Sequence, residues 1–295
     1  HVGMPSSSSH AIVGGLVGAG IAAGGVKAIS WSSVEKAAVG IVASPAVAIA
    51  VAFVAMYVIF GIQRLFKWHD NHPVFKGLQV VAAGALSFGH GANDAQKTMG
   101  VVAALLLGAG YTTAGKGGAI TVPEWVALSA YGAIALGTLW GGWKIIETMG
   151  LKITTLHANS GAAANIGAST AIFGATALGA PISTTHAAAS SVVGAGVASG
   201  KGANWRVVGE MVLAWIFTVP AAAAIAFVVY WLTQMPTVLS WIAVGIVVVG
   251  FGIWVAWAVR HTVHAADVEA EIPSEEELDV LEPMGPHLRG GGPVE

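Results

Sequence analysis

Residues 34–62 read VEKAAVGIVASPAVAIAVAFVAMYVIFGI, an apolar run whose charges, Glu35 and Lys36, lie at its start. At a rise of about 1.5 Å per residue, a helix over this run is long enough to cross about 30 Å of hydrocarbon. The whole chain is 55% hydrophobic and 9% charged, with a mean hydropathy of +0.74. Soluble domains are far more polar. The sequence therefore predicts an all-α integral membrane protein that crosses the bilayer several times.

Other apolar segments fall into two groups. Continuous spanning helices are also expected over residues 123–146, 207–233 and 238–259. Apolar segments cut by Gly, Ser, Thr or Pro cover residues 5–24, 76–110 and 158–200. We expect these to form broken or re-entrant helices, which are tolerated at membrane depth where the freed backbone groups face protein or water. The alternative is that they are loops outside the membrane.

The end of the chain has a different composition. After Arg260 it becomes acidic, with a Glu275-Glu276-Glu277 run and a Gly290-Gly291-Gly292 run. Such a segment cannot bury a core, so residues 260–295 are predicted to be disordered. The chain has no cysteine, which excludes disulfides, thiolate metal sites and thiol nucleophiles.

An internal repeat links two distant segments. Residues 5–10 read PSSSSH and residues 181–186 read PISTTH, an offset of 176 (181 minus 5). Glu35 and Pro45 recur as Glu210 and Pro220 at an offset of 175 (210 minus 35). Repeats that carry interrupted helices in corresponding positions are typical of secondary transporters, with the substrate between the repeats near the midplane. Chance similarity between two Ala/Gly-rich segments is the alternative.

Residues 89–100, GHGANDAQKTMG, place an acid, an amide and a cation within an apolar segment. A charge at the bilayer centre costs at least about 2.5 kcal/mol, so such residues indicate an ion or substrate pathway. Gly89 and Gly91 are expected to unwind the helix, so that Asn93 or Asp94 caps the helix that follows. Alternatively, Asp94 and Lys97 merely neutralise each other across one helical turn.

Hydroxyl side chains recur at the two expected helix starts. At such a start, unsatisfied N–H groups and the helix dipole attract anions, whereas plain helix capping is the alternative. His10 and His186 follow the hydroxyls, and we favour helix packing or capping over metal ligation for both because no carboxylate lies at ligand spacing. No metal site is predicted. The hydroxyl residues are Ser7, Ser8, Ser9, Ser183, Thr184 and Thr185.

These motifs together resemble a known family. Gly-x-Asn-Asp-Ala-Gln-Lys-x-Met-Gly, followed by Pro-x-Ser-Thr-Thr-His, is similar to the second-repeat signature of the Pit-type inorganic phosphate transporters, and the likeness extends over residues 3–259. The resemblance implies two inverted repeats with phosphate held between them. It assigns phosphate binding to Asn93, Asp94, Ser183, Thr184, Thr185, Ser7, Ser8 and Ser9, cation or proton coupling to Asp94 and Asn93, and supporting roles to Gln96, Lys97, Gly91, His10 and His186.

The resemblance also predicts how the chain is organised. We expect residues 1–62 to be the remainder of repeat one, 63–75 a connecting loop, 76–259 repeat two and 260–295 the tail. Shifting Asn93 back by 176 residues gives a negative number, so the first Gly-x-Asn-Asp motif would lie before His1. The sequence as given is therefore expected to lack the start of repeat one.

The expected function is transport of inorganic phosphate, free or as a metal–phosphate complex, by symport with protons. Protons are favoured over sodium because Gln96-Lys97 resembles the bacterial branch of the family. The alternatives are a sodium-coupled phosphate or sulfate permease, a passive anion channel and, more remotely, a membrane-embedded metal-dependent hydrolase that uses His90, Asp94 and His186. No catalytic residue and no cofactor are expected. The expected partners are phosphate, a proton or sodium ion, the lipid bilayer of a bacterial inner membrane and a second copy in a homodimer, with no nucleic acid.

Overall fold

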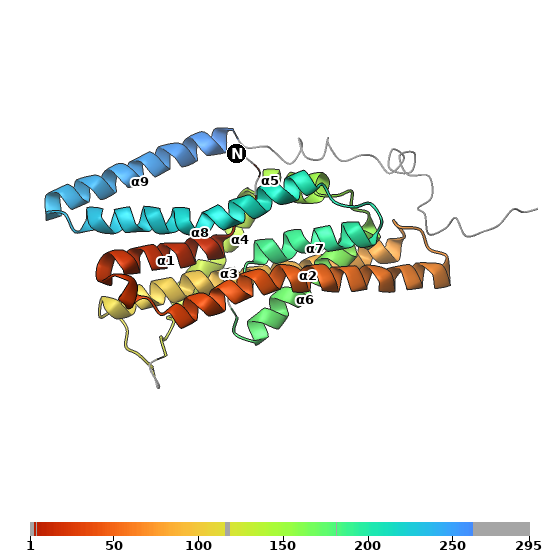
Figure 1. Cartoon of the computed structure of the whole chain (residues 1–295), viewed down its shortest axis with the longest axis horizontal. Helices are drawn as coiled ribbons and strands as arrows, with labels where there is room; N and C mark the ends of the chain where they lie inside the picture. Colours follow the sequence, from red (N-terminus) through yellow and green to blue (C-terminus); the bar gives the residue numbers. More distant parts are fainter. Residues whose placement is uncertain (1–2, 4, 116–118, 181, 262–295) are drawn as a thin grey trace, which may run out of the picture.

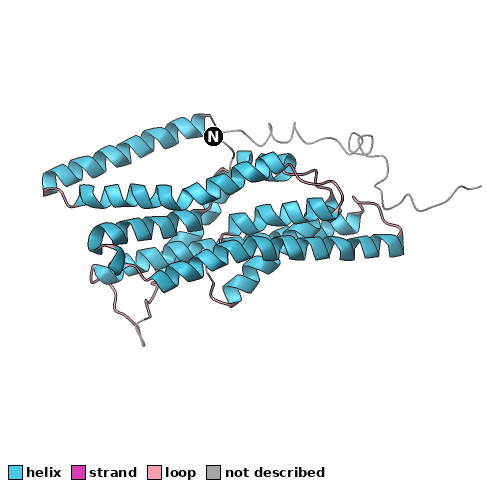
Figure 2. Cartoon of the chain, in the orientation of Figure 1, coloured by secondary structure: helices cyan, strands magenta, loops and turns pink. Residues whose placement is uncertain are grey.

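The computed structural model describes residues 3, 5–115, 119–180 and 182–261, and within them the fold is helical (Figure 1). No strand is drawn in this part of the chain (Figure 2). The predicted disordered tail lies outside the described residues from 262 onward. The helices are α1 (Ser8–Gly24), α2 (Trp31–Phe66), α3 (Pro73–Gly108), α4 (Glu124–Trp140), α5 (Trp143–Glu147), α6 (Ala158–Ala177), α7 (Thr184–Ala198), α8 (Trp205–Thr233) and α9 (Thr237–Arg260), with a short 3-10 helix, Val26–Ala28, and a π-helical turn, Thr148–Lys152.

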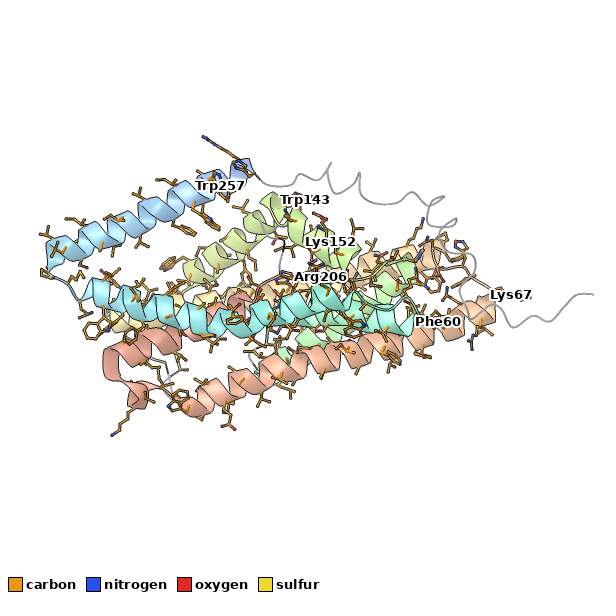
Figure 3. All side chains as sticks on the ribbon, turned by 45° about the horizontal axis from the view of Figure 1, so that its top comes forward. Phe60, Lys67, Trp143, Lys152, Arg206 and Trp257 are labelled. Atoms are coloured by element: carbon orange, nitrogen blue, oxygen red, sulfur yellow. The ribbon has the colours of Figure 1, made fainter. Side chains whose placement is uncertain are left out.

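Three of the described helices, α2, α8 and α9, are long and apolar enough to cross a membrane. The predicted spans 34–62, 207–233 and 238–259 lie within them. Helix α9 packs against α8 and carries exposed apolar side chains such as Trp241 and Phe251. Figure 3 shows side chains along this helix, with the exposed Trp257 labelled near its end. An apolar surface of this extent suits lipid rather than water. The prediction of an all-α membrane protein is confirmed.

The prediction of one continuous helix over residues 123–146 is wrong. Helix α4 ends at Trp140, and α5 begins at Trp143. Between them Gly141 is fully extended, and Gly142 has a φ of 96°, a region that residues with a side chain rarely adopt. The two glycines therefore end the helix despite the apolar residues on both sides.

The prediction of a broken helix over residues 76–110 is also wrong. Helix α3 runs without interruption through 36 residues, and Gly89 and Gly91 remain helical within it. The predicted break in 158–200 is present, because α6 ends at Ala177 and α7 begins at Thr184. Gly179, in the turn between them, has a φ of 63°. A left-handed glycine interrupts the helix here, whereas the glycines of α3 keep helical angles.

Two pairs of helices pack in a reciprocal manner. Helix α1 packs against α8, and α7 packs against α2. In each pair a glycine brings two backbones close together: a Cβ added to Gly18 would lie 2.0 Å from the Ala223 carbonyl oxygen, and one added to Gly194 would lie 2.6 Å from that of Ile49. Small residues at such contacts are typical of membrane helix packing. Since Gly194 is the repeat equivalent of Gly18 (194 minus 18 is 176), the two contacts correspond.

The main core lies where α2, α6 and α7 meet, and it is built largely from alanine, with Met56, Ile59 and Phe75 as larger members. A polar contact fixes α6 to the α2–α3 connection at one end of this core. The Asp70 carboxylate accepts hydrogen bonds from Gln63 Nε2 at 2.8 Å and Asn159 Nδ2 at 3.0 Å. This contact holds the start of α6, and with it the α6–α7 hairpin, against α2 and α3.

Candidate phosphate site at two helix starts

The starts of α1 and α7 have the same local structure. Ser7 and Ser183 are the N-caps, and their hydroxyls accept hydrogen bonds from the backbone N–H groups of His10 and His186, at 3.2 Å in each case. The prediction that these segments begin helices is confirmed. Each cap satisfies one of the four N–H groups that a helix start leaves without an intrahelical partner. The others, together with the helix dipole, leave each start suited to an anion.

The two helix starts meet inside the protein. The Ser9 hydroxyl, in the first turn of α1, donates a hydrogen bond of 2.9 Å to the backbone carbonyl of Ile182, just before α7. The His10 and His186 rings lie edge to face with their centroids 4.4 Å apart, and His186 also stacks on Trp215 at 3.7 Å. Both histidines are buried. The packing role predicted for them is therefore present in the structure.

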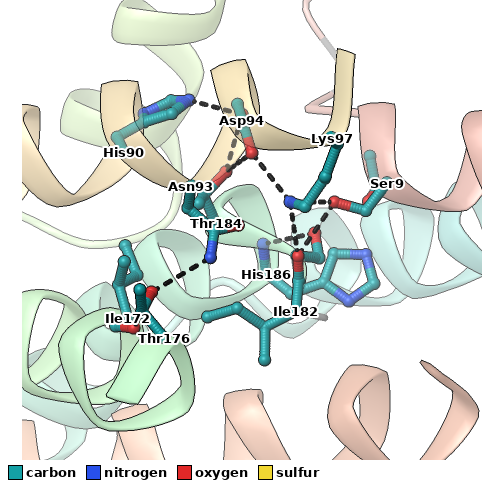
Figure 4. Close-up of polar contacts among 12 residues, drawn as sticks. Ser9, His90, Asn93, Asp94, Lys97, Ile172, Thr176, Ile182, Thr184 and His186 are labelled. Atoms are coloured by element: carbon teal, nitrogen blue, oxygen red, sulfur yellow. Dashed lines mark hydrogen bonds and ion pairs between the residues drawn. The ribbon is translucent and has the colours of Figure 1, made fainter. Parts of the chain in front are cut away.

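Asp94 connects helix α3 to the start of α7 (Figure 4). Its carboxylate accepts a hydrogen bond from the Thr184 hydroxyl, whose oxygen lies 3.0 Å from Oδ2 and 3.2 Å from Oδ1. The same carboxylate lies 2.9 Å from Lys97 Nζ and 3.0 Å from His90 Nε2. The Asp94 side chain is 13% exposed and that of His90 is 48% exposed, so His90 lies on the more open side.

Lys97 joins three segments at once. Its ammonium donates hydrogen bonds to Asp94 Oδ1 at 2.9 Å, to Ser9 Oγ at 2.6 Å and to the Ile182 carbonyl at 2.7 Å. The Asp94–Lys97 pairing, which the spacing suggested as the alternative to an ion or substrate pathway, is therefore present. It is part of a wider network, because the same ammonium also contacts residues from the starts of α1 and α7.

The prediction that Asn93 or Asp94 caps a helix is wrong. Both lie in the middle of α3, where the backbone N–H groups bond within the helix, so no cap is needed. The buried Asn93 side chain instead donates to the Thr176 hydroxyl at 3.2 Å, and Thr176 in turn donates to the Ile172 carbonyl at 2.8 Å. Asn93 therefore fastens α3 to the last turns of α6.

The structure brings most, but not all, of the predicted residues together. Ser9, Asp94, Lys97 and Thr184 form a connected polar network, with Ser7 and Ser183 as the caps beside it. Asn93 lies next to Asp94 in the chain but bonds separately, to Thr176. Two predicted members, Ser8 and Gln96, are exposed, whereas Gly91 and Thr185 are half-buried.

The phosphate site predicted from the sequence left out three residues that contact it: His90, Thr176 and Trp215. Of these, only His90 was named from the sequence, as part of the alternative hydrolase site. The position of His90, four residues before Asp94 on one helix, could have identified the first of these contacts. Thr176 and Trp215 reach the site from α6 and α8 through tertiary packing. No local sequence pattern indicates these two contacts.

The chemistry of the site fits an oxyanion better than a metal. Two helix starts and several hydroxyls offer hydrogen-bond donors, the Lys97 ammonium adds a positive charge, and Asp94 adds an acceptor. Among the described residues no group of three or more His, Asp or Glu side chains could hold a metal ion.

Fold and site together define an α-helical membrane protein with an enclosed polar site between helix starts. Residues 1–226 match the model of the phosphate transporter family. The chain belongs to this family, whose function is transport rather than catalysis.

Individual proteins show the same similarity. A "probable low-affinity inorganic phosphate transporter" of Rhizobium meliloti (strain 1021) is 44% identical over 237 residues, which cover 79% of this chain and 69% of the relative. A protein of Bacillus subtilis (strain 168) with the same description is 36% identical, covering 80% and 70%. A solved structure titled "The sodium-dependent phosphate transporter" has a TM-score of 0.67 and 26% identity, covering 79% of this chain and 74% of that one.

Proposed function

We propose that this chain carries inorganic phosphate across the bacterial inner membrane by symport with protons, as a multi-pass protein. The observation that supports this most strongly is the contact between Asp94 in α3 and Thr184 at the start of α7, 3.0 Å apart. It places a carboxylate beside a helix start, at the point where the start of α1 also arrives through the Ser9–Ile182 hydrogen bond. A proton acceptor and an anion-binding helix start thus adjoin each other inside an apolar bundle.

The proposed binding mode uses the hydrogen-bond donors at the two helix starts and the Asp94 carboxylate as an acceptor. Phosphate oxygens accept hydrogen bonds from the first-turn N–H groups of α1 and α7 and from the hydroxyls of Ser9 and Thr184. A protonated phosphate also carries a hydroxyl that can donate to the Asp94 carboxylate. Sulfate, a pure acceptor at neutral pH, cannot make that last bond, so the carboxylate favours phosphate over sulfate.

The reciprocal packing of α1 on α8 and of α7 on α2 supports two inverted repeats around this site. Under the repeat offset α1 corresponds to α7 and α2 to α8, so a two-fold relation exchanges the two contacts. Residues 1–62 then belong to repeat one and 76–259 to repeat two. We propose that the substrate lies at the repeat interface, as in other secondary transporters built in this way. Assembly as a homodimer stays a prediction.

Proton coupling is proposed because the Asp94 carboxylate can take up a proton itself. A protonated carboxylate is neutral, so the site then needs no metal cation to balance its charge. The related solved structure is titled as sodium-dependent, and that dependence is a property of that protein. Sodium coupling is therefore the alternative that the experiment must separate. Movement of phosphate as a neutral metal complex is a further alternative, which differs from free phosphate transport in requiring a divalent metal.

Uptake of radiolabelled phosphate into proteoliposomes tests the proposal. Purified chain is reconstituted, and an inward proton gradient or an inward sodium gradient is applied separately, with and without Mg²⁺, and with unlabelled sulfate as competitor. We expect saturable accumulation with the proton gradient alone and little competition by sulfate. Accumulation driven by sodium alone would show that sodium, and not the proton, is the coupling ion. Entry of phosphate without accumulation under any gradient would indicate a channel.

Variants at the helix start test the binding mode. Thr184→Ala and Ser183→Ala each remove a hydroxyl near the proposed anion, and we expect phosphate affinity to fall about 10- to 150-fold. Ser183→Ala also removes a helix cap. Asn204→Ala is the matched control, because Asn204 caps α8 at an exposed position. Equal loss of affinity in Asn204→Ala and Ser183→Ala would show a general effect of cap removal.

A further inference from the structure

The Lys97 ammonium is surrounded by three oxygen atoms of different kinds. They are the Asp94 carboxylate at 2.9 Å, the Ser9 hydroxyl at 2.6 Å and the Ile182 backbone carbonyl at 2.7 Å. An ammonium has three N–H donors and no acceptor, so each donor has one oxygen. The Lys97 side chain is 15% exposed, and the three oxygens replace most of the water that it would otherwise bind.

The same three oxygens are a ligand set for a hard metal cation. Carboxylate, hydroxyl and backbone carbonyl oxygens are the groups with which proteins bind such ions. The Ile182 carbonyl is available because residue 182 lies in the non-helical segment between α6 and α7. Carbonyls freed at interrupted membrane helices coordinate sodium ions in secondary transporters.

We propose that Lys97 is a built-in replacement for a sodium ion, and that its side chain closes a cation site formed by Asp94, Ser9 and Ile182. This inference deepens the proposed function, since it names the residue that selects against sodium as the coupling ion. With Lys97 in place the charges of Asp94 and the ammonium cancel. Without it, a carboxylate and two neutral oxygens remain around a space of cation size, with a charge of −1.

A purely structural role for Lys97 makes a different prediction. If the ammonium only fastens α1, α3 and α7 together, its removal weakens the fold equally in all salts. If it stands in for a cation, sodium replaces it and restores the lost stability. The response to sodium, as distinct from other monovalent cations, therefore separates the two roles.

The test is the melting temperature of the purified full chain in NaCl and in choline chloride at equal ionic strength, without phosphate. Wild type should melt at the same temperature in both salts. Lys97→Ala should melt lower in choline and rise by about 3 °C or more when sodium is about tenfold above its dissociation constant. Lys36→Ala is the control, because Lys36 is exposed on α2. Adding Ser9→Ala to Lys97→Ala should raise the sodium midpoint about tenfold or more.

Three results would overturn the inference. They are sodium-specific stabilisation of the wild type, a folded Lys97→Ala variant that melts alike in both salts, and a Lys97→Ala variant that is unfolded in both. Because no phosphate is present, these measurements can be interpreted whether or not the proteoliposomes accumulate phosphate. Failure of the inference and failure of the proposed function are thus distinguishable.

Discussion

Helix α3 and the α6–α7 hairpin look alike in sequence and differ in structure. Both are apolar segments interrupted by glycines and polar residues. Yet α3 is continuous from Pro73 to Gly108, whereas the other segment is divided between Ala177 and Thr184. The difference shows that polar side chains alone do not break a membrane helix.

The backbone explains the contrast. In α3 the polar side chains find partners on other helices, as Asn93 does on Thr176 and Asp94 on Thr184, so the helix itself need not open. In the hairpin, Gly179 adopts a φ of 63°, and in the sequence a proline follows at position 181. Left-handed glycine and proline end a helix because they change its angles or remove a donor.

The glycines of the two segments also differ in their surroundings, and Gly194→Ala should give the largest effect. A Cβ at Gly194 of α7 would lie 2.6 Å from the Ile49 carbonyl oxygen and 2.9 Å from its Cα, both backbone atoms of α2. Because neither can move without shifting α2, we expect a loss of about 3 kcal/mol, measured by thermal unfolding in detergent. An unchanged melting temperature would mean that α7 and α2 do not pack this closely.

Gly179→Ala should have an intermediate effect on the same measurement. The left-handed conformation costs a residue with a side chain about 1–2 kcal/mol, although no described atom lies within 4 Å of the added Cβ. Gly179→Asn is the matched variant, since asparagine tolerates this conformation better and should lose less. Equal losses for the two variants would point to side-chain size rather than backbone conformation.

Gly91→Ala should have the smallest effect, and of opposite sign. Gly91 lies within continuous α3, and no described atom would contact an added Cβ within 4 Å. Alanine should therefore stabilise the helix by about 1 kcal/mol, as should Gly100→Ala further along α3. If Gly91→Ala lowers stability while Gly100→Ala raises it, then α3 is interrupted near Gly91 in the folded protein.

The sequence was sufficient for the class of fold and for much of the site. Apolar length predicted α2, α8 and α9, and the duplicated Pro-x-Ser motif predicted two helix starts, which Ser7 and Ser183 cap in the structure. The spacing of Asp94 and Lys97 indicated their pairing, although only as the alternative to an ion or substrate pathway. Each of these features depends on residues close together in the chain, where propensity and periodicity act directly.

The remainder depends on contacts between distant segments. Gly91 keeps helical angles and Gly142 does not, so residue type alone does not say which glycine leaves the helical region. Lys97 bonds to Ser9 and to the Ile182 carbonyl, which lie 88 and 85 residues away from it in the chain. Thr176 and Trp215 likewise reach the site through tertiary packing, which one sequence does not specify.

The most direct test of the account measures proton-driven phosphate accumulation, with protein abundance, for Asp94→Asn and for Asp94→Asn combined with Lys97→Met. Asp94→Asn should fold, because Lys97 keeps Ser9 and the Ile182 carbonyl as partners, and should abolish accumulation, because the amide cannot take up the proton. We predict that the double variant also fails to accumulate phosphate. Restored, gradient-driven accumulation in the double variant would contradict the role of Asp94, because it would show that the carboxylate only neutralises Lys97.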